Sequence, residues 1–186
     1  MANVYTYQVL RDTTEKTTIK LTAMFDGSGQ EANNARIQAN TLSNALATNG
    51  FLLANNQGGA ANTSLPYYDL QLTGIKYFVN FPTANVGGVE LFWNGGGSTA
   101  AAQYANSSTI VHLQSQGDFG NGEQLPSITN NATGNQLGDI GVYSSGAIAN
   151  AAYTLIISLR KNNTMYQRGQ FQEPAAFNYG PYGLKP

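Results

Sequence analysis

Cysteine is absent from this chain of 186 residues. Its absence excludes a disulfide framework and every cysteine-based metal site. Histidine is nearly absent as well, because His112 is the only one. Zinc or copper would therefore have to be bound mainly by carboxylates, which suit these ions poorly. We expect neither a metal ion nor a cofactor.

Charge is scarce too. Charged residues make up 10% of the chain, against about 25% in an ordinary globular protein, and the formal net charge is −1. Such a chain lacks the positive electrostatic potential that attracts nucleic acid or an anionic membrane, so we expect neither as a partner. A surface with so little charge suits a protein that packs against copies of itself or other partners, although a cell-surface protein could share this composition.

Long apolar runs are missing. No stretch of about 18 apolar residues occurs, which excludes a membrane-spanning helix. The first residues, MANVY, have neither the basic region nor the apolar region of a secretory signal, so we expect no export by that route.

The few carboxylates do not indicate a site. The ten Asp and Glu residues lie singly along the chain, so no pair stands out as the two carboxyl groups of a glycosidase. Asp26 and Asp118 begin glycine-bearing loops that could offer oxygen atoms to calcium, but we favour turn capping by both side chains. His112 lies in a strand-like stretch with no nucleophile elbow, so we predict that it is an ordinary residue of a strand. We therefore expect no catalytic residues and no enzyme activity.

What the sequence does contain is a succession of strand patterns. Residues 19–25 alternate between apolar and polar side chains, and the longest pattern, residues 67–81, changes phase at Gly74, which predicts a β-bulge. Trp93 alternates with polar residues and is predicted to lie in the core. Because no convincing amphipathic helix separates the strands, we predict an all-β fold over residues 1–161: an antiparallel β-sandwich, jelly-roll-like.

Other predicted elements are shorter. A short helical turn is expected at residues 43–47. Further strands are expected at residues 4–10, 36–42, 89–93, 109–113, 125–129, 139–143 and 153–160.

The last 25 residues, 162–186, have no strand or helix period and contain three Pro and three Gly. They nevertheless carry large aromatic side chains, which a merely solvated tail would not carry. We interpret this segment as an extended C-terminal arm that binds another molecule; the alternative is that it packs on its own domain. Its expected partner-binding anchors are Tyr166, Phe171, Phe177, Tyr179 and Tyr182.

Four stretches carry a resemblance to a known class of protein. They are NVYTYQVLRDTTEKTTIKLTAMFDG (residues 3–27), VELFWN (89–94), LGDI (137–140) and YTLIISLRK (153–161). They resemble small virion structural proteins of tailed bacteriophages, particularly phages of marine and freshwater bacteria. The arm extends beyond the shorter members of that class.

The resemblance implies a particle component without chemistry of its own. Its most specific form is a capsid decoration (cement) protein, made in the host cytoplasm and placed on the capsid surface of the virion. Its expected partners are the major capsid protein, copies of itself or both, in a homo-oligomer or a multi-copy assembly. The alternatives are a neck, tail or fibre component, a carbohydrate-binding host-attachment module and, ranked last, a glycoside hydrolase or lyase.

Overall fold

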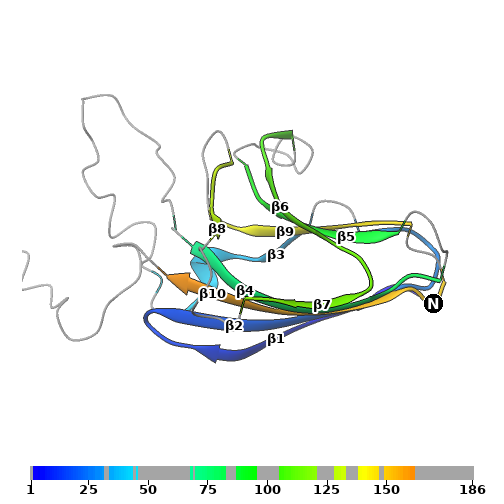
Figure 1. Ribbon diagram of the computed structural model, residues 1–186, viewed down its shortest axis with the longest axis horizontal. Helices are drawn as coiled ribbons and strands as arrows, with labels where there is room; N and C mark the ends of the chain where they lie inside the picture. Colours follow the sequence, from blue (N-terminus) through cyan, green and yellow to red (C-terminus); the bar gives the residue numbers. More distant parts are fainter. Residues whose placement is uncertain are drawn as a thin grey trace, which may run out of the picture.

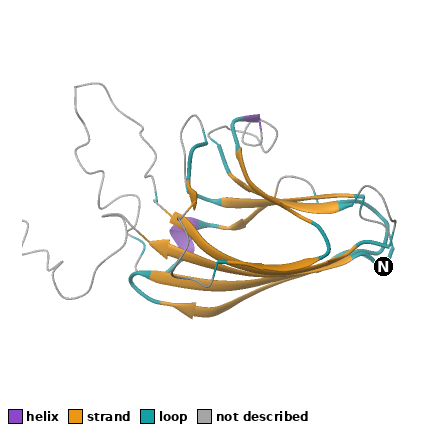
Figure 2. Ribbon diagram, in the orientation of Figure 1, coloured by secondary structure: helices purple, strands orange, loops and turns teal. Residues whose placement is uncertain are grey.

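Ten β-strands in two antiparallel sheets make up most of the described chain (Figures 1 and 2). The structure is a computed structural model. It describes residues 2–31, 34–43, 45, 68, 70–82, 87–95, 105–120, 128–132, 138–146 and 149–161. The arm, with its five predicted anchors, lies outside these residues, and so do residues 46–67.

The first sheet, sheet A, has the strand order β1-β2-β10-β4-β7, and β8 pairs with β4 beside β7. The second, sheet B, has the order β3-β9-β5-β6. The strands of sheet A are β1 (Val4–Asp12), β2 (Lys16–Met24), β10 (Ala152–Lys161), β4 (Leu70–Asn80), β7 (Gln116–Phe119) and β8 (Ile128–Thr129). Those of sheet B are β3 (Asn34–Ile37), β9 (Ile140–Ser145), β5 (Gly88–Trp93) and β6 (Ser108–Leu113).

The strand pairs are nested along the chain. β5 pairs with β6, and this hairpin is enclosed in sequence by the pair β4–β7, then by β3–β9 and finally by β2–β10. Successive pairs alternate between sheet B and sheet A. One long hairpin wound in this way into two sheets is a jelly roll, and β1 adds an outer strand to it. The predicted all-β sandwich fold is confirmed.

Alternating side chains from the two sheets form the core. In β2 and β10 every second residue is buried, and Ile19 and Leu21 lie opposite Ile157 and Leu155 in the neighbouring strand. Burial of each such side chain contributes about 1.5–3 kcal/mol. Trp93 is fully buried in this core, as predicted, but β5 is buried on both faces rather than on alternate residues.

The predicted bulge lies where the phase changes. β10 pairs Ser158 with Gly74 but Leu159 with Leu72, so Thr73 is the extra residue on β4. The hydroxyl of Thr73 donates a hydrogen bond to the backbone oxygen of Ser158 at 3.1 Å. The bulge lets the apolar residues on both sides of Gly74 face the core although their spacing in sequence is irregular.

The prediction for residues 36–42 is wrong. β3 ends at Ile37, and the 3₁₀ helix η1 (Ala39–Thr41) follows it. The backbone N–H of Ala39 donates to Asp139 Oδ1 at 2.8 Å, and the N–H of Thr41 donates to Gln38 O at 3.1 Å. These bonds use groups that a strand would offer to its neighbour, so a 3₁₀ turn follows β3 directly. Most of the helical turn predicted at residues 43–47 lies outside the described residues.

Candidate functional site at the start of the C-terminal segment

Lys161 is the last residue of β10 and directly precedes residues 162–186. Its side chain is 0% exposed, and that of its ion-pair partner Asp12 is 11% exposed. An ammonium group taken out of water is costly unless charge and hydrogen-bond partners compensate it. The protein therefore has to supply hydrogen-bond acceptors and a negative charge for a lysine in this position.

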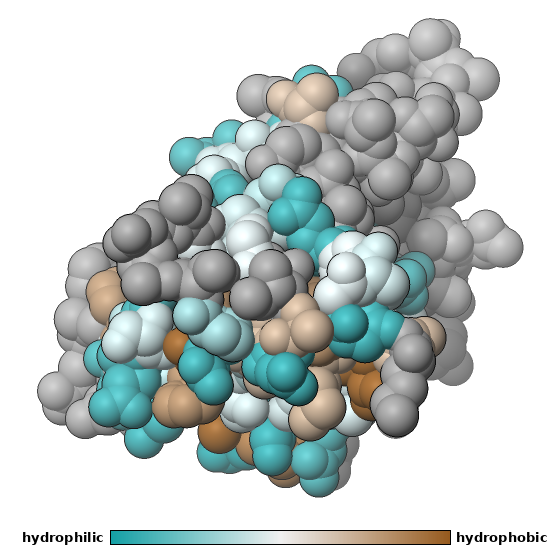
Figure 3. Space-filling model, turned by 90° about the vertical axis from the view of Figure 1, so that its right-hand side faces the viewer, coloured by the Kyte–Doolittle hydropathy of each residue, from teal (hydrophilic) through white to brown (hydrophobic). Residues whose placement is uncertain are grey.

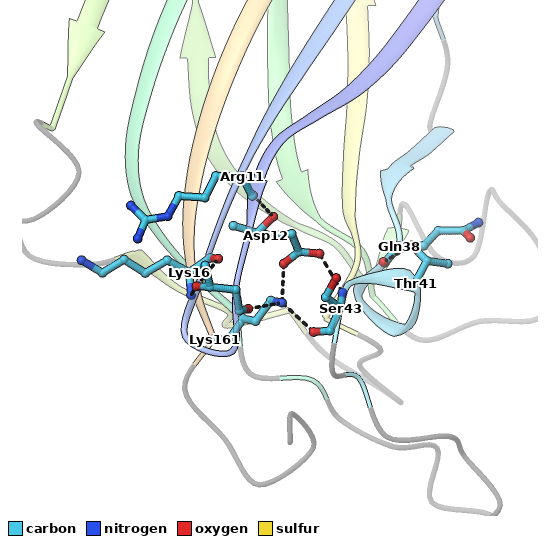
Figure 4. Close-up of polar contacts among 9 residues, drawn as sticks. Arg11, Asp12, Lys16, Gln38, Thr41, Ser43 and Lys161 are labelled. Carbon is cyan, nitrogen blue, oxygen red and sulfur yellow. Dashed lines mark hydrogen bonds and ion pairs between the residues drawn. The ribbon is translucent and has the colours of Figure 1, made fainter. Parts of the chain in front are cut away.

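The ammonium group has protein partners for its three N–H donors. Nζ donates to Asp12 Oδ1, to the backbone oxygen of Thr13 at 2.7 Å and to that of Ser43 at 2.7 Å (Figure 4). The other carboxylate oxygen of Asp12 accepts the backbone N–H of Ser43 at 2.7 Å. We call Lys161, Asp12, Thr13 and Ser43 the exit clamp.

The β1–β2 turn presents these groups in fixed positions. Thr13 closes the turn because its backbone N–H donates to Lys16 O at 2.8 Å and its hydroxyl accepts the Lys16 N–H at 3.1 Å. The backbone N–H of Lys161 donates to Glu15 O at 2.7 Å, so main chain and side chain both bind the turn. The exit clamp thus holds the end of β10, directly before residue 162.

A second buried network closes the sandwich between β1 and β3. Glu31 accepts hydrogen bonds from the Tyr153 hydroxyl at 2.6 Å and from Arg36 Nε, and the Arg36 guanidinium lies 4.0 Å from the centre of the Tyr5 ring. The Glu31 N–H donates to Ser144 Oγ at 2.7 Å. Glu31 therefore connects sheet A, through Tyr153, to sheet B, through Ser144.

Burial shifts the titration of this network. Desolvation raises the pKa of Glu31, while the bonds from Tyr153 and Arg36 oppose that shift. Burial, and then the nearby Glu31 charge, raise the pKa of the Tyr153 hydroxyl far above its ordinary range. Tyr153 is therefore a permanent hydrogen-bond donor, and the arrangement is suited to holding the two sheets together.

The pKa values of two aspartates, Asp139 and Asp26, are shifted in opposite directions. Burial raises the pKa of Asp139, although the Ala39 N–H bound to its carboxylate opposes the shift. Hydrogen bonds from Ser28 lower the pKa of Asp26. Asp139 thus contributes stability below about pH 4 that is lost as the pH rises through its folded-state pKa. Asp26 contributes stability above about pH 4 that is lost as the pH falls.

We therefore expect Asp139→Asn and Asp26→Asn to respond oppositely to pH. Relative to the wild type, the Asp139→Asn protein should gain stability as the pH rises from about 3 to about 7, because it no longer buries a carboxylate. The Asp26→Asn protein should lose stability over the same range. Urea unfolding at several pH values measures both differences, and a change of the same sign in the two variants would contradict the assignment.

His112 lies on β6, as predicted. Its Nε2 is 3.5 Å from Glu90 Oε2, and its side chain is exposed. The hydroxyl of Thr109 donates to the same glutamate, at Oε1, rather than to the imidazole. In a catalytic pair the hydroxyl would instead be bound to the imidazole that acts as its general base. The contacts of Glu90 with His112 and Thr109 are cross-strand side-chain contacts between β5 and β6.

The two candidate calcium loops differ from each other. Asp26 caps a turn as predicted, because the Ser28 N–H donates to Asp26 Oδ1 at 2.8 Å. Asp118 instead lies on β7, where its carboxylate is 3.1 Å from Lys76 Nζ, so the predicted turn cap is wrong there. Within the described ranges, no group of three or more histidines and carboxylates could hold a metal ion.

Sequence reasoning missed both buried networks. The burial of Lys161 could have been predicted, because Lys161 continues the alternation that points Tyr153, Leu155, Ile157 and Leu159 of β10 into the core. Glu31 and Asp139 carried no such signal, since Tyr153 is 122 residues from Glu31 along the chain and Ala39 is 100 residues from Asp139. The predicted anchors Tyr166, Phe171, Phe177, Tyr179 and Tyr182 lie outside the described residues.

Comparison with known proteins adds no family: no family model matches the chain, and no curated protein matches it. No helix in the described part is both long enough and apolar enough to cross a membrane. A function for this protein has to be inferred from its residues and its geometry.

Proposed function

We propose that this protein is a non-enzymatic virion structural component, in its most specific form a capsid decoration (cement) protein. It would bind the major capsid shell, copies of itself or both, through the jelly roll and the arm of residues 162–186. The observation that carries the proposal is the exit clamp, in which Lys161, the residue before an aromatic-rich segment, is fixed to Asp12, Thr13 and Ser43.

An anchored arm is physically suited to this role. Its aromatic residues can each contribute about 1.5–3 kcal/mol when they are buried on a partner, against the entropy cost of ordering the segment. A second contact made by the same molecule forms at a high effective concentration, provided that the arm starts at a defined place. The small charge of the chain, −1 net, also permits many copies to lie side by side.

Removal of residues 162–186 should abolish incorporation into particles while the jelly roll stays folded. The fold should survive because the core formed by the described residues lies within residues 19–159. The measurement is the amount of the truncated chain that co-sediments with purified virions, with its folding checked by circular dichroism. Normal incorporation of the folded, truncated chain would refute the role of the arm.

A matched pair of full-length variants sharpens this test. Changing Phe171 and Tyr179 to serine removes two anchors, whereas changing their neighbours Gln170 and Asn178 to serine keeps the anchors and alters only polar residues. Only the first variant should lose incorporation. Labelling on intact virions separates a capsid position from a neck, tail or fibre position, and a glycan array tests the carbohydrate-binding alternative.

A further inference from the structure

β1 forms the outer edge of sheet A. In the described part of the chain it pairs only with β2, so one side of its backbone has no strand beside it. β1 has 9 residues, whereas the other edge strands have 6 or fewer. A long open edge presents a row of backbone donors and acceptors to any strand that reaches it.

Exposed apolar side chains gather on the same strand. Seven large apolar side chains are exposed in the described residues, and four of them, Val4, Tyr7, Val9 and Leu10, belong to β1. Tyr7 and Val9 lie opposite the buried residues Leu21 and Ile19, so they are on the inner face of sheet A. They are exposed because β1 is an added strand beyond the jelly-roll pairs.

The other edges carry features that discourage strand pairing along most of their length, whereas in β1 such features lie only after Val9. β3 and β6 each contain a register shift, β6 carries His112, and β7 is short and includes Asp118. From Val4 to Val9, β1 keeps continuous register with β2 and contains neither charge nor proline. Its single register shift comes later, between Val9 and Arg11.

We propose that two copies of this chain form a homodimer by antiparallel pairing of their β1 strands. A two-fold axis perpendicular to the sheet would pass beside Tyr7 and join the two A sheets into one. This inference does not depend on the virion role. Because strand pairing keeps inner-face residues opposite inner-face residues, Tyr7 would face Tyr7 of the second copy.

A second copy fits this edge better than an unrelated partner would. In the register centred on Tyr7, each Tyr5 lies opposite Val9 of the other copy, a favourable aromatic and β-branched pair, and Thr6 lies opposite Gln8. The paired segments are uncharged, so like charges do not meet at the centre. At the end of the molecule where β1 begins, Figure 3 shows apolar residues separated by polar ones.

Sedimentation velocity over a range of concentrations should show a dimer for the full chain. Tyr7→Lys places two ammonium groups opposite each other and should weaken the dimer roughly tenfold or more. An equimolar mixture of the Tyr7→Lys and Tyr7→Glu proteins should restore it. Phe78→Lys is the matched control, because Phe78 is 52% exposed and Tyr7 45%, but Phe78 lies on the outer face of β4.

Single-cysteine variants test the register. Because the chain has no cysteine, any disulfide in a Tyr7→Cys protein must join two copies. Residues directly opposite in an antiparallel pair are close enough for a disulfide, so Tyr7→Cys should cross-link and Phe78→Cys should not. A monomeric wild-type chain, whether β1 is open or covered by its own chain, would overturn the proposal, as would equal cross-linking of the two variants.

Discussion

Replacing Lys161 with methionine is expected to lower the free energy of unfolding by about 3–5 kcal/mol, the usual cost of removing one partner from a buried ion pair. Methionine keeps the length of the side chain but removes the ammonium group. The Asp12 carboxylate would then remain mostly buried without the ammonium group that pairs with it, and the backbone oxygens of Thr13 and Ser43 would each lose a donor. Urea denaturation measures the loss.

The control is another lysine in an ion pair, at the surface. Lys76 lies 3.1 Å from Asp118, but the two side chains are 62% and 45% exposed. Lys76→Met should therefore cost less than about 1 kcal/mol. Adding Asp12→Asn to Lys161→Met should recover part of the loss, because it removes the unpaired charge. A loss at Lys161 no larger than that at Lys76 would show that the exit clamp does not stabilise the fold.

Replacing Glu31 with leucine is expected to cost about 3 kcal/mol. The buried Tyr153 hydroxyl would lose its acceptor, and Arg36 would lose the carboxylate that holds it over Tyr5. Glu31→Gln should cost less, because an amide oxygen can still accept from Tyr153. Thermal unfolding followed by circular dichroism measures both variants.

A double variant separates the two contributions at Glu31. Combining Glu31→Leu with Tyr153→Phe removes the orphaned hydroxyl together with its acceptor, so the combined loss should be smaller than the sum of the two single losses. Equal stability of the Glu31→Leu and Glu31→Gln proteins would contradict the bond to Tyr153. Additive losses in the double variant would contradict it independently.

Several features of the fold were predictable because they are local. The inward residues of β2 and the bulge beside Gly74 follow from side-chain alternation, which any strand imposes on its own sequence. The turn cap at Asp26 needs only the residue two positions ahead. By contrast, the end of β3 depends on Asp139, a residue remote in sequence, and the prediction failed there.

The sequence by itself determined an all-β chain without cysteine, with little charge and with an aromatic C-terminal segment. The role of that segment as a partner-binding arm stays a prediction. Tertiary structure alone decided that the strand pairs are nested, that Lys161 meets Asp12 and Ser43, and that β1 is left at an edge. The physical reason is that alternation says which face of a strand is apolar, whereas the choice of neighbouring strand and of charged partner depends on segments far apart in the chain.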